Sequence, residues 1–385
     1  MYLRNGKVGV LDLASNESEE QDLTEEDSLH SLKIAESLLA EHGPDALVLG
    51  TGVLTASFVP AACAGFLLSK NGLMPILGFA GVELKLSGFD FVVLKNRADV
   101  HGYLWIRDGM MEFVESEAMT SSDSWMRTDK IRSDQGDNKI HVLSVGLWGD
   151  QAKAASQVVI DHWGGEDKAG LGADFGARKL AAIAFRGMGE LELKEPEKHL
   201  EDSILLMNEH IKKLGESKGL ASYSKVAVRE DFKKLTHRVV ACYGCPYPCR
   251  SYLKVFEDPS ELRMVAKEPG YLHYDVPALE AAFSSGLDAN ESTIALMLCA
   301  KAGVEPVSVF SSVQKISLSA IEAAVQNPSD IMNANKANFE SSFKNTEEYR
   351  AALDLGVCPR YWAKVGFDFE AVASYAQSVL DISLS

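Results

Sequence analysis

Residues Ala46–Ser69 read ALVLGTGVLTASFVPAACAGFLLS and carry no charged side chain over a length that could span a bilayer. A continuous transmembrane helix is one interpretation of so long an uncharged run. Gly50, Gly52 and Pro60, with the threonines between them, instead favour buried strands joined by tight turns, because glycine and proline interrupt helices and permit turns. The stretch therefore predicts the interior of a folded domain, with no membrane span.

Strand patterns surround this stretch on both sides. Met1–Leu13 alternates apolar and polar side chains, which is typical of a strand rather than of a signal peptide. Asp108-Gly109 predicts a hairpin turn, because both central residues of the favoured two-residue turn need positive φ. We expect the acidic stretch Glu17–Asp27 to be a solvated face or loop. The predicted strands are Val8–Leu13, Ala46–Thr55, Phe89–Leu94, Tyr103–Arg107, Met111–Glu115, Ile140–Val145 and Leu180–Arg186.

The composition is that of a soluble globular protein, with 46% hydrophobic and 24% charged residues. A chain of 385 residues suits two or three domains. The 38 basic and 55 acidic side chains give a net charge of −17, which argues against binding to nucleic acid or anionic membranes. Since no signal peptide is indicated, we expect the protein in the cytoplasm. Six cysteines in such a chain favour metal or cluster ligation over a disulfide framework.

The pattern becomes helical after about residue 187. Pro196–Lys218 and Asp288–Ala302 predict amphipathic helices, and Asp288 with Glu291 forms a capping-box pattern before the terminating Gly303. We expect an α+β fold, in which a β-rich N-terminal domain precedes a shortened all-helical region. The predicted parts are an α+β domain at 1–190, a helical domain with a three-cysteine loop at 191–325, a linker at 326–345, and C-terminal helices with a fourth cysteine at 346–385, built from Thr346–Leu355 and Asp368–Ile382.

Three cysteines lie close together in the segment ACYGCPYPCR, residues 241–250. Thiolates at this spacing can reach three corners of one cuboidal cluster if the backbone wraps around it, and Gly244 permits that conformation. Cys358 can supply the fourth thiolate, because it follows a helix closed by Gly356 and Pro359 prevents that helix from continuing. We therefore predict a redox function and a 4Fe-4S cluster. Its predicted ligands are Cys242, Cys245, Cys249 and Cys358.

Two other uses of these thiols remain open. A structural zinc ion is one, although zinc sites usually contain two paired-cysteine turns and the second pair is absent here. Unrelated buried thiols are the other. The remaining cysteines, Cys63 and Cys299, lie in apolar surroundings, and we expect both to be core residues rather than ligands.

A second segment, Gly170–Gly176 (GLGADFG), resembles a phosphate-cradling loop. The signal is weak, because a predicted strand rather than a helix follows and the spacing has one residue too many for a dinucleotide fingerprint. The nine histidines show no metal-ligand spacing. His273-Tyr274-Asp275 is the only cluster suited to proton transfer, and we assign no catalytic residue.

The chain resembles the tungsten-pterin aldehyde:ferredoxin oxidoreductases almost from end to end. The cysteine loop matches the family's CxxCxxxC, and Leu355–Cys358 matches its GLC, which supplies the family's fourth cluster ligand. The resemblance implies a 4Fe-4S cluster, a tungsten- or molybdenum-pterin and ferredoxin as electron partner. The other similar segments are Met1–Leu13 (opening strand), Gly50–Thr55 (GPLTG-like), Val82–Asp90 (ELKFAGYD) and Gly170–Gly187 (GVGAVMGSKNLKAIAVEG).

The motifs that bind the two pterins in this family are altered here. The paired acidic motifs lack their leading acids, at Ala300 and Leu353, and Pro75–Gly78 replaces a segment that approaches the cofactor. The arginine-rich loop that would balance cofactor phosphates is replaced by His162–Lys168, which carries two acids. Between Gly303 and Cys358, a large helical segment is reduced to the linker. If the chain still binds a pterin, the resemblance implies that Gly170, Gly172 and Lys168 contact that cofactor.

These departures favour a pterin-free, 4Fe-4S electron-transfer or structural subunit of a larger oxidoreductase complex, typical of anaerobic metabolism. The alternative is an active tungsten or molybdenum enzyme that oxidises aldehydes with ferredoxin as acceptor, and a third possibility is a paralogue with zinc or no metal. The expected partner is ferredoxin, a larger redox subunit or a second copy of the chain. We expect apolar surface around Ile294–Ala302 and docking near Tyr243, Tyr247 and Trp362.

Overall fold

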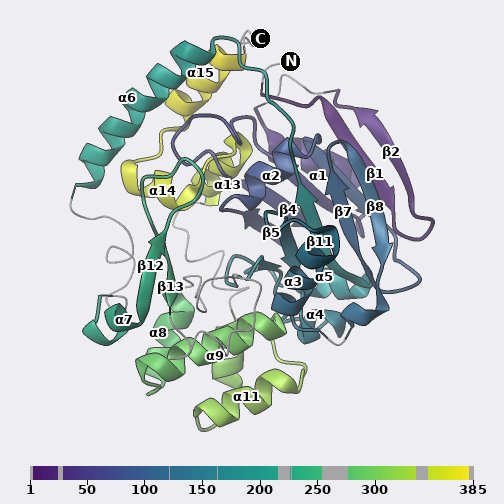
Figure 1. The fold of residues 1–385 in the computed structure, drawn as a ribbon, viewed down its shortest axis with the longest axis vertical. Coiled ribbons are helices and arrows are strands. Elements are labelled where there is room, and N and C mark those ends of the chain that lie inside the picture. Colours follow the sequence, from purple (N-terminus) through teal and green to yellow (C-terminus); the bar gives the residue numbers. More distant parts are fainter. Residues whose placement is uncertain are drawn as a thin grey trace.

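Two β-sheets form the centre of the N-terminal part (Figure 1). The computed structural model describes residues 3–24, 29–120, 122–162, 164–215, 226, 228–253, 276–334 and 346–380. The first sheet has the strand order β2-β1-β6-β3-β4-β5 and the second β10-β9-β11-β7-β8. The strands are β1 Lys7–Asp12, β2 Glu17–Asp22, β3 Leu47–Thr51, β4 Gly65–Ser69, β5 Gly72–Ile76, β6 Phe91–Lys95, β7 Gly102–Arg107, β8 Met110–Glu115, β9 His141–Ser144, β10 Val159–Ile160 and β11 Leu180–Arg186.

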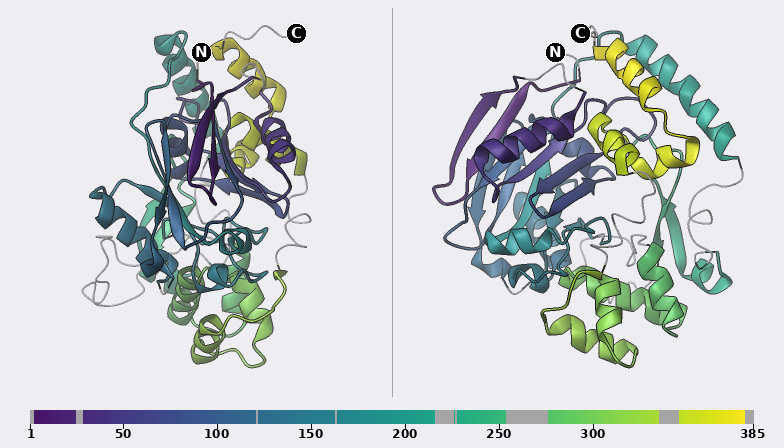
Figure 2. Two further views of the ribbon diagram at one scale, coloured as in Figure 1. Left: turned by 90° about the vertical axis from the view of Figure 1, so that its right-hand side faces the viewer. Right: turned by 180° about the vertical axis from the view of Figure 1, so that it is seen from behind.

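The two sheets share one apolar core. Leu49 and Val92 of the first sheet belong to the same buried cluster as Leu104 and Ile183 of the second, so one face of each sheet packs against the other. Helix α1 (Ser31–His42) covers the opposite face of the first sheet (Figure 2). β1 pairs with β6, and β7 with β11, in parallel, whereas the other pairs in these sheets are antiparallel.

The rest of the described chain is helical except for one two-stranded ribbon, formed by β12 (Thr236–Val240) and β13 (Arg250–Leu253). Helices α8 to α11 gather at one end of the molecule, and α6 with α13 to α15 gather at the other (Figure 1). The helices are α2 Ala80–Leu86, α3 Ser124–Gln135, α4 Leu147–Asp150, α5 Gly172–Ala177, α6 Pro196–Leu214, α7 Glu230–Leu235, α8 Val276–Ser284, α9 Ala289–Ala302, α10 Pro306–Ser312, α11 Leu318–Gln326, α13 Thr346–Leu355, α14 Pro359–Val365 and α15 Phe369–Leu380.

This architecture confirms the predicted α+β fold, with all seven predicted strands present at nearly the predicted positions. Asp108 and Gly109 have φ of 46° and 82° and join β7 to β8, as the hairpin prediction requires. The Asp288 and Glu291 capping box is formed, and Gly303 closes α9 in the left-handed conformation. No helix in the described part of the chain is long and apolar enough to cross a membrane. The domain boundaries within the chain stay predictions.

Four local predictions were wrong or incomplete. Residues Glu17–Asp22 are solvated, as predicted, and this solvated face is the edge strand β2, which was not among the predicted strands. A short helix, α5, precedes strand β11 after the glycine-rich segment. Pro359 was predicted to stop a helix, but it is also the first residue of α14. Proline is favoured at that position, because the first N–H of a helix has no partner within the helix. The ribbon of β12 and β13 was not predicted.

The expected apolar surface on α9 is absent from the described part of the chain. Helices α8, α10 and α11 pack against α9, and Ala295, Leu296 and Cys299 lie in the core that these helices share. The segment after Gly303 was expected to be reduced to a linker. It instead contains α10 and α11, which cover α9. Of the linker predicted at Gln326–Asn345, residues 335–345 lie outside the described residues, as does the His273-Tyr274-Asp275 cluster.

Candidate metal centre

The three-cysteine loop connects the two strands of the β12–β13 ribbon. Val240 pairs with Arg250 at the end of the ribbon, so the ends of the loop are held together just outside the first and last cysteines. Gly244 has φ of 59°, and the Cys245 N–H donates to the Cys242 carbonyl across 3.2 Å. The loop therefore turns back on itself, as wrapping around a cluster requires.

Cys358 lies between α13 and α14, where it forms the N-cap of α14. Gly356 turns the chain with φ of 82°, a conformation that a side chain would strain. A Cβ atom on Gly356 would also lie 2.2 Å from Thr55 Oγ1 and 2.7 Å from the Thr55 nitrogen. The turn before Cys358 is thus packed directly against the loop that follows β3.

That loop, residues 52–64, lies between both cysteine-bearing segments. The Ala61 N–H donates to the Gly244 carbonyl across 3.0 Å, and the Ala61 carbonyl accepts from the Cys358 N–H across 2.9 Å. The Ala64 N–H donates to the Gly356 carbonyl across 3.0 Å. Backbone hydrogen bonds therefore fix Cys358 and the three-cysteine loop to one segment of the N-terminal part.

All four predicted ligands meet at this junction. Cys242, Cys249 and Cys358 are buried in one apolar cluster, and Cys245 packs against it. Burial, reinforced by neighbouring cysteine charges, raises the pKa of Cys249 to about 12 and also raises the pKa of Cys245. The structure thus gathers thiols that are far apart in the sequence.

A fifth thiol, Cys63, joins the four. It is fully buried, as expected for a core residue, but its side chain contacts both Cys242 and Cys358. Hydrogen bonding from Cys63 lowers the pKa of Cys242 to about 6 and lowers the pKa of Cys358. Cys299, by contrast, lies in the separate core around α9. Sequence spacing gave no sign that Cys63 would lie in this group.

The four predicted ligands are all cysteine thiols, which are donors that both a 4Fe-4S cluster and a structural zinc ion accept. Within the described residues, no three His, Cys, Asp or Glu side chains converge as one metal ion requires, whereas zinc needs donors at about 2.0–2.3 Å from one point. A cuboidal cluster instead holds four thiolates apart, one at each iron.

Buried charges adjoin the cysteines. Glu166 accepts from Arg250 Nη2 at 3.3 Å and from Arg360 Nη2 at 2.8 Å. The two cations lower the pKa of Cys242 and Cys249, partly offsetting the effect of burial. Glu166 was predicted to repel cofactor phosphates, and here it is engaged with two arginines. Sequence reasoning missed this trio, whose members come from three distant segments.

The glycine-rich segment holds an anion of the chain itself. The buried Asp167 carboxylate accepts from the N–H groups of Gly170 at 2.8 Å and Gly172 at 3.1 Å. It also accepts from Val158 at 2.9 Å and Ala169 at 3.0 Å. Burial raises the Asp167 pKa against the effect of these donors. The amides predicted to hold a cofactor phosphate are therefore already bonded to a carboxylate, and the Lys168 carbonyl accepts from Asn333.

A cavity of about 450 Å³ lies beside the cysteine loop. Arg132 and His141 in its wall both bond to Asp161, at 2.8 Å and 2.7 Å, so these side chains are held in place. The cavity includes positions where the resemblance placed altered pterin motifs. It is lined by Leu77, Gly78, Phe79, Arg132, His141, Ile160, Asp161, His162, Arg238, Val239, Val240, Ala241, Arg250 and Tyr252.

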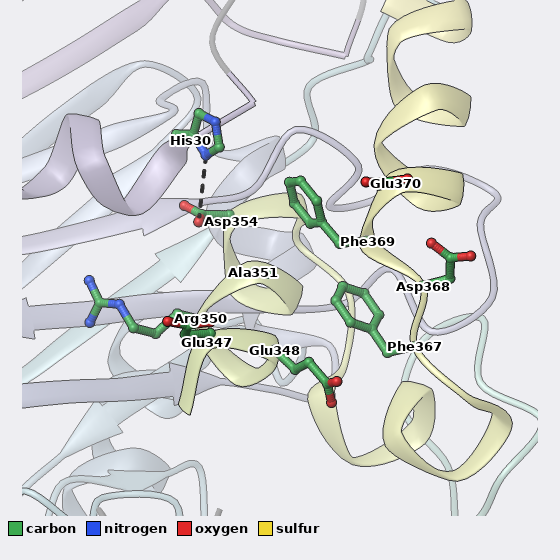
Figure 3. Close-up of a pocket in the computed structure, with 10 residues that line it drawn as sticks. All are labelled: His30, Glu347, Glu348, Arg350, Ala351, Asp354, Phe367, Asp368, Phe369 and Glu370. Carbon is green, nitrogen blue, oxygen red and sulfur yellow. Dashed lines mark ion pairs between the residues drawn. The ribbon is translucent and has the colours of Figure 1, made fainter. Parts of the chain in front are cut away.

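A larger cavity, of about 710 Å³, lies between α13, the start of α15 and His30 (Figure 3). Phe367 and Phe369 extend toward α13. His30 Nδ1 lies 4.0 Å from Asp354 Oδ2. Five of the residues in its wall are acidic and none is a cysteine. The thiols therefore belong to a different part of the molecule, although Phe367 packs edge-on against Trp362.

The predicted docking residues are mostly inaccessible. Tyr247 and Trp362 are 1% and 3% exposed, and the Trp362 indole N–H donates to the Pro60 carbonyl. Tyr243 is only half-buried. A partner could reach Tyr243 without rearrangement, whereas Tyr247 and Trp362 serve the packing of the cysteine site.

Comparison with known proteins adds family information for the N-terminal part. Residues 13–187 match the model of the aldehyde ferredoxin oxidoreductase N-terminal domain. The tungsten-containing aldehyde ferredoxin oxidoreductase of Thermococcus kodakarensis is 26% identical over 179 residues, which are 45% of this chain and 29% of that relative. The Pyrococcus furiosus enzyme of the same name is 24% identical over 174 residues, 44% of this chain and 28% of the relative. The matches thus span less than a third of these enzymes.

A structural likeness extends over nearly the whole chain. The active-site complex BamBC of benzoyl coenzyme A reductase, solved with 1,5-dienoyl-CoA, contains a chain that superimposes with a TM-score of 0.68. The superposition covers 97% of this chain and 65% of that one, at 14% sequence identity. At that identity the likeness establishes a common fold, which includes the region that holds the cysteines.

Proposed function

We propose that the chain is a 4Fe-4S redox protein without a pterin, on the premise that residues 13–187 match the model of the aldehyde ferredoxin oxidoreductase N-terminal domain. Its role is electron transfer or structural support within a larger oxidoreductase complex, in an anaerobic, cytoplasmic setting. The observation that carries the proposal is the junction at Ala61, which bonds to Gly244 in the three-cysteine loop and to Cys358.

Cys242, Cys245, Cys249 and Cys358 would hold the cluster, which supplies one-electron transfer. These side chains are mostly buried, so the charge of their thiolates needs compensation inside the protein. Arg250 and Arg360 lie close enough to lower the pKa of Cys249, and they would offset part of that charge. Glu166 holds both arginines in position beside the site.

Two features support the absence of a pterin. Asp167 occupies the backbone amides of Gly170 and Gly172, which a cofactor phosphate would otherwise use. Glu166 engages Arg250 and Arg360, the charged groups nearest the thiols that could neutralise a phosphate. A cofactor phosphate would have to displace these carboxylates, and each displacement would leave buried groups without partners.

Metal analysis of protein purified without oxygen tests the proposal. We expect about four iron atoms and four sulfide ions per chain, with neither tungsten nor molybdenum. Zinc in place of iron would support a structural metal site and contradict the redox role. Protein with no bound metal, even after reconstitution with iron and sulfide, would contradict both.

One observation favours the runner-up function, an active tungsten or molybdenum enzyme that oxidises aldehydes and passes electrons to ferredoxin. The cavity of about 450 Å³ beside Arg250 and Ala241 provides space next to the cluster site. Stoichiometric tungsten or molybdenum with extractable pterin, and aldehyde-dependent reduction of viologen dye, would establish that function instead.

The partner of the proposed subunit is a larger redox protein, ferredoxin or a second copy of the chain. The BamBC likeness supports a place in a complex, because that protein is described as an active-site complex. Native purification with light scattering and cross-linking tests this part. A monodisperse monomer with no co-purifying redox protein would contradict it.

A further inference from the structure

The cavity of about 450 Å³ beside the cysteine loop has a composition that the proposed function does not explain. Three side chains in its wall are arginines, Arg132, Arg238 and Arg250, whereas Asp161 is the one acidic residue among the described residues that line it. The whole chain carries a net charge of −17, so a wall with more cations than anions differs from the rest of the protein. Several guanidinium groups around one cavity favour an anionic ligand.

Two of these arginines are held in position by carboxylates of the chain. Arg132, on α3, donates from Nη2 to Asp161 at 2.8 Å, and Arg250, at the start of β13, donates from Nη2 to Glu166 at 3.3 Å. Gly78 leaves space beside Arg250, because a Cβ atom at this position would lie 3.1 Å from Arg250 Nη1. A guanidinium has five N–H donors, so it can bond to more than one acceptor at once. The two carboxylates nearby disfavour a ligand with more than one negative charge.

The third arginine and the apolar part of the wall come from the ribbon and from the start of α2. The Arg238 guanidinium lies 4.5 Å from the centre of the Tyr252 ring, on the paired strand. Phe79 is 50% exposed, and its ring stacks with the ring of His141 at 6.5 Å with an interplanar angle of 11°. With Ile160, these rings give the cavity an apolar surface next to its charges. The wall therefore suits a ligand with one negative charge and an apolar or aromatic body.

We propose that this cavity binds a small organic acid, whose carboxylate bonds to the arginines and whose apolar or aromatic body packs against Phe79 and Tyr252. A carboxylate presents two oxygens in one plane, which match the paired N–H groups of a guanidinium, and it carries a single charge. A phosphate would bring a second charge close to Asp161 and Glu166. The inference goes beyond the proposed function and does not depend on the cluster.

Calorimetric titration of the purified full chain with phenylacetate tests the site. Phenylacetamide has nearly the same shape without the charge, and inorganic phosphate has charge without the apolar body, so we expect phenylacetate to bind more tightly than either compound. Arg238→Gln should weaken phenylacetate binding roughly tenfold or more, because a charge-assisted hydrogen bond is lost. Phe79→Ala should also weaken it, because apolar contact is lost. Both side chains are exposed, so these changes leave the core intact, and Arg107→Gln, at an exposed position of β7 outside the cavity wall, is the control.

Several results would overturn the inference. Equal binding of phenylacetamide would mean that the arginines take no part, and tighter binding of phosphate would assign the cavity to phosphorylated ligands. Phenylacetate binding that Arg238→Gln leaves unchanged would place the ligand elsewhere, and pterin extracted in stoichiometric amount would make the cavity a cofactor site.

Iron content, measured on the same samples, separates this inference from the proposed function. Protein with four irons that does not bind phenylacetate would overturn the inference and leave the cluster proposal intact. Protein that takes up no cluster but binds phenylacetate through Arg238 would overturn the proposed function and support the inference.

Discussion

The Cys358 N–H donates to the Ala61 carbonyl across 2.9 Å, although the two residues lie in opposite parts of the chain. The N–H of the same Ala61 donates to Gly244, inside the three-cysteine loop. One residue in the N-terminal part therefore bonds to both cysteine-bearing segments, through its N–H and its carbonyl. If a cluster forms here, its assembly depends on the correct folding of residues 52–64 as much as on the cysteines themselves.

The first prediction concerns the ligands. Cys245→Ala and Cys358→Ala should reduce the iron content from about four to three or fewer atoms per chain, because a cuboidal cluster that lacks one thiolate loses or exchanges an iron. Cys299→Ala, in the core around α9, should keep the full content. Iron and sulfide assays with absorption spectra measure this. Full iron content in both ligand variants would exclude these residues as ligands.

The second prediction concerns the turn before Cys358. Gly356 and Gly366 have nearly equal φ of 82° and 86°, but a Cβ atom on Gly356 would meet Thr55 Oγ1 at 2.2 Å and one on Gly366 would meet nothing within 4 Å. Gly366→Ala should therefore cost only the backbone strain, about 1–3 kcal/mol. Gly356→Ala should cost at least about 2 kcal/mol more in free energy of unfolding, because the packing must also shift.

Denaturant unfolding of the two glycine variants measures the difference, and their iron contents show whether it reaches the site. We expect reduced iron uptake in Gly356→Ala and normal uptake in Gly366→Ala. Equal stabilities would mean that the contact between Gly356 and Thr55 relaxes without cost, and that the turn is not rigidly placed.

The fold was predictable from the sequence where apolar runs and turn residues act locally. The strands around Ala46–Thr55 and Leu180–Arg186 are buried on both faces, so their sequences are almost uniformly apolar. The helix at Asp288 carries its own start and stop signals in the capping box and Gly303. Pro359 was ambiguous, because the same residue that ends one helix is favoured at the first position of the next.

The site was only partly predictable, because its parts meet through long-range packing. The spacing of Cys242, Cys245 and Cys249 is a local signal, whereas Cys63 is a single cysteine in an apolar run and carries none. The pairing of Glu166 with Arg250 and Arg360 likewise depends on three segments that meet only in the fold. A sequence pattern shows which residues can bind a metal, but not which buried neighbours compensate their charge.

The third prediction concerns the carboxylate in the glycine-rich segment. Asp167→Ala leaves the N–H groups of Val158, Ala169, Gly170 and Gly172 without their acceptor. Because each unsatisfied buried donor costs about 1–3 kcal/mol, we expect a loss of at least about 3 kcal/mol. Asp123→Ala, which removes an N-cap from α3, should cost only about 1 kcal/mol.

Phosphate provides a second measurement of the same segment. If Asp167 fills the amide cradle, inorganic phosphate should raise the melting temperature of Asp167→Ala more than that of the wild-type protein, because an anion replaces the missing carboxylate. Comparable stabilisation of both proteins would show that phosphate binds elsewhere, or that the wild-type cradle is open to a cofactor phosphate.

The fourth prediction is a pH dependence that arises at His210. This α6 residue is 2% exposed, and its Nδ1 lies 2.8 Å from the Tyr361 hydroxyl, beside the cysteine site. Burial, with a contribution from Lys213, lowers the His210 pKa to about 4. In the unfolded chain a histidine titrates near 6.5, so between these two pH values the unfolded state binds more protons. The folding stability therefore decreases as the pH is lowered through this range. The contribution of neutral His210 is complete above about pH 6.5 and is lost as the pH falls toward 4.

The depressed pKa corresponds to at most about 3 kcal/mol over that range. His210→Gln, which cannot be protonated, should therefore flatten the decline in free energy of unfolding between pH 6.5 and pH 4.5. His30→Gln is the control, since the His30 side chain is 56% exposed and lies in the wall of the cavity next to α13.

Burial also lowers the pKa of His199. A double variant, His199→Gln with His210→Gln, should therefore show a still smaller decline in free energy of unfolding over this pH range. A His210→Gln profile as steep as the wild-type profile would show that His210 is protonated in the folded protein without loss of its contact to Tyr361, and that acid sensitivity arises elsewhere.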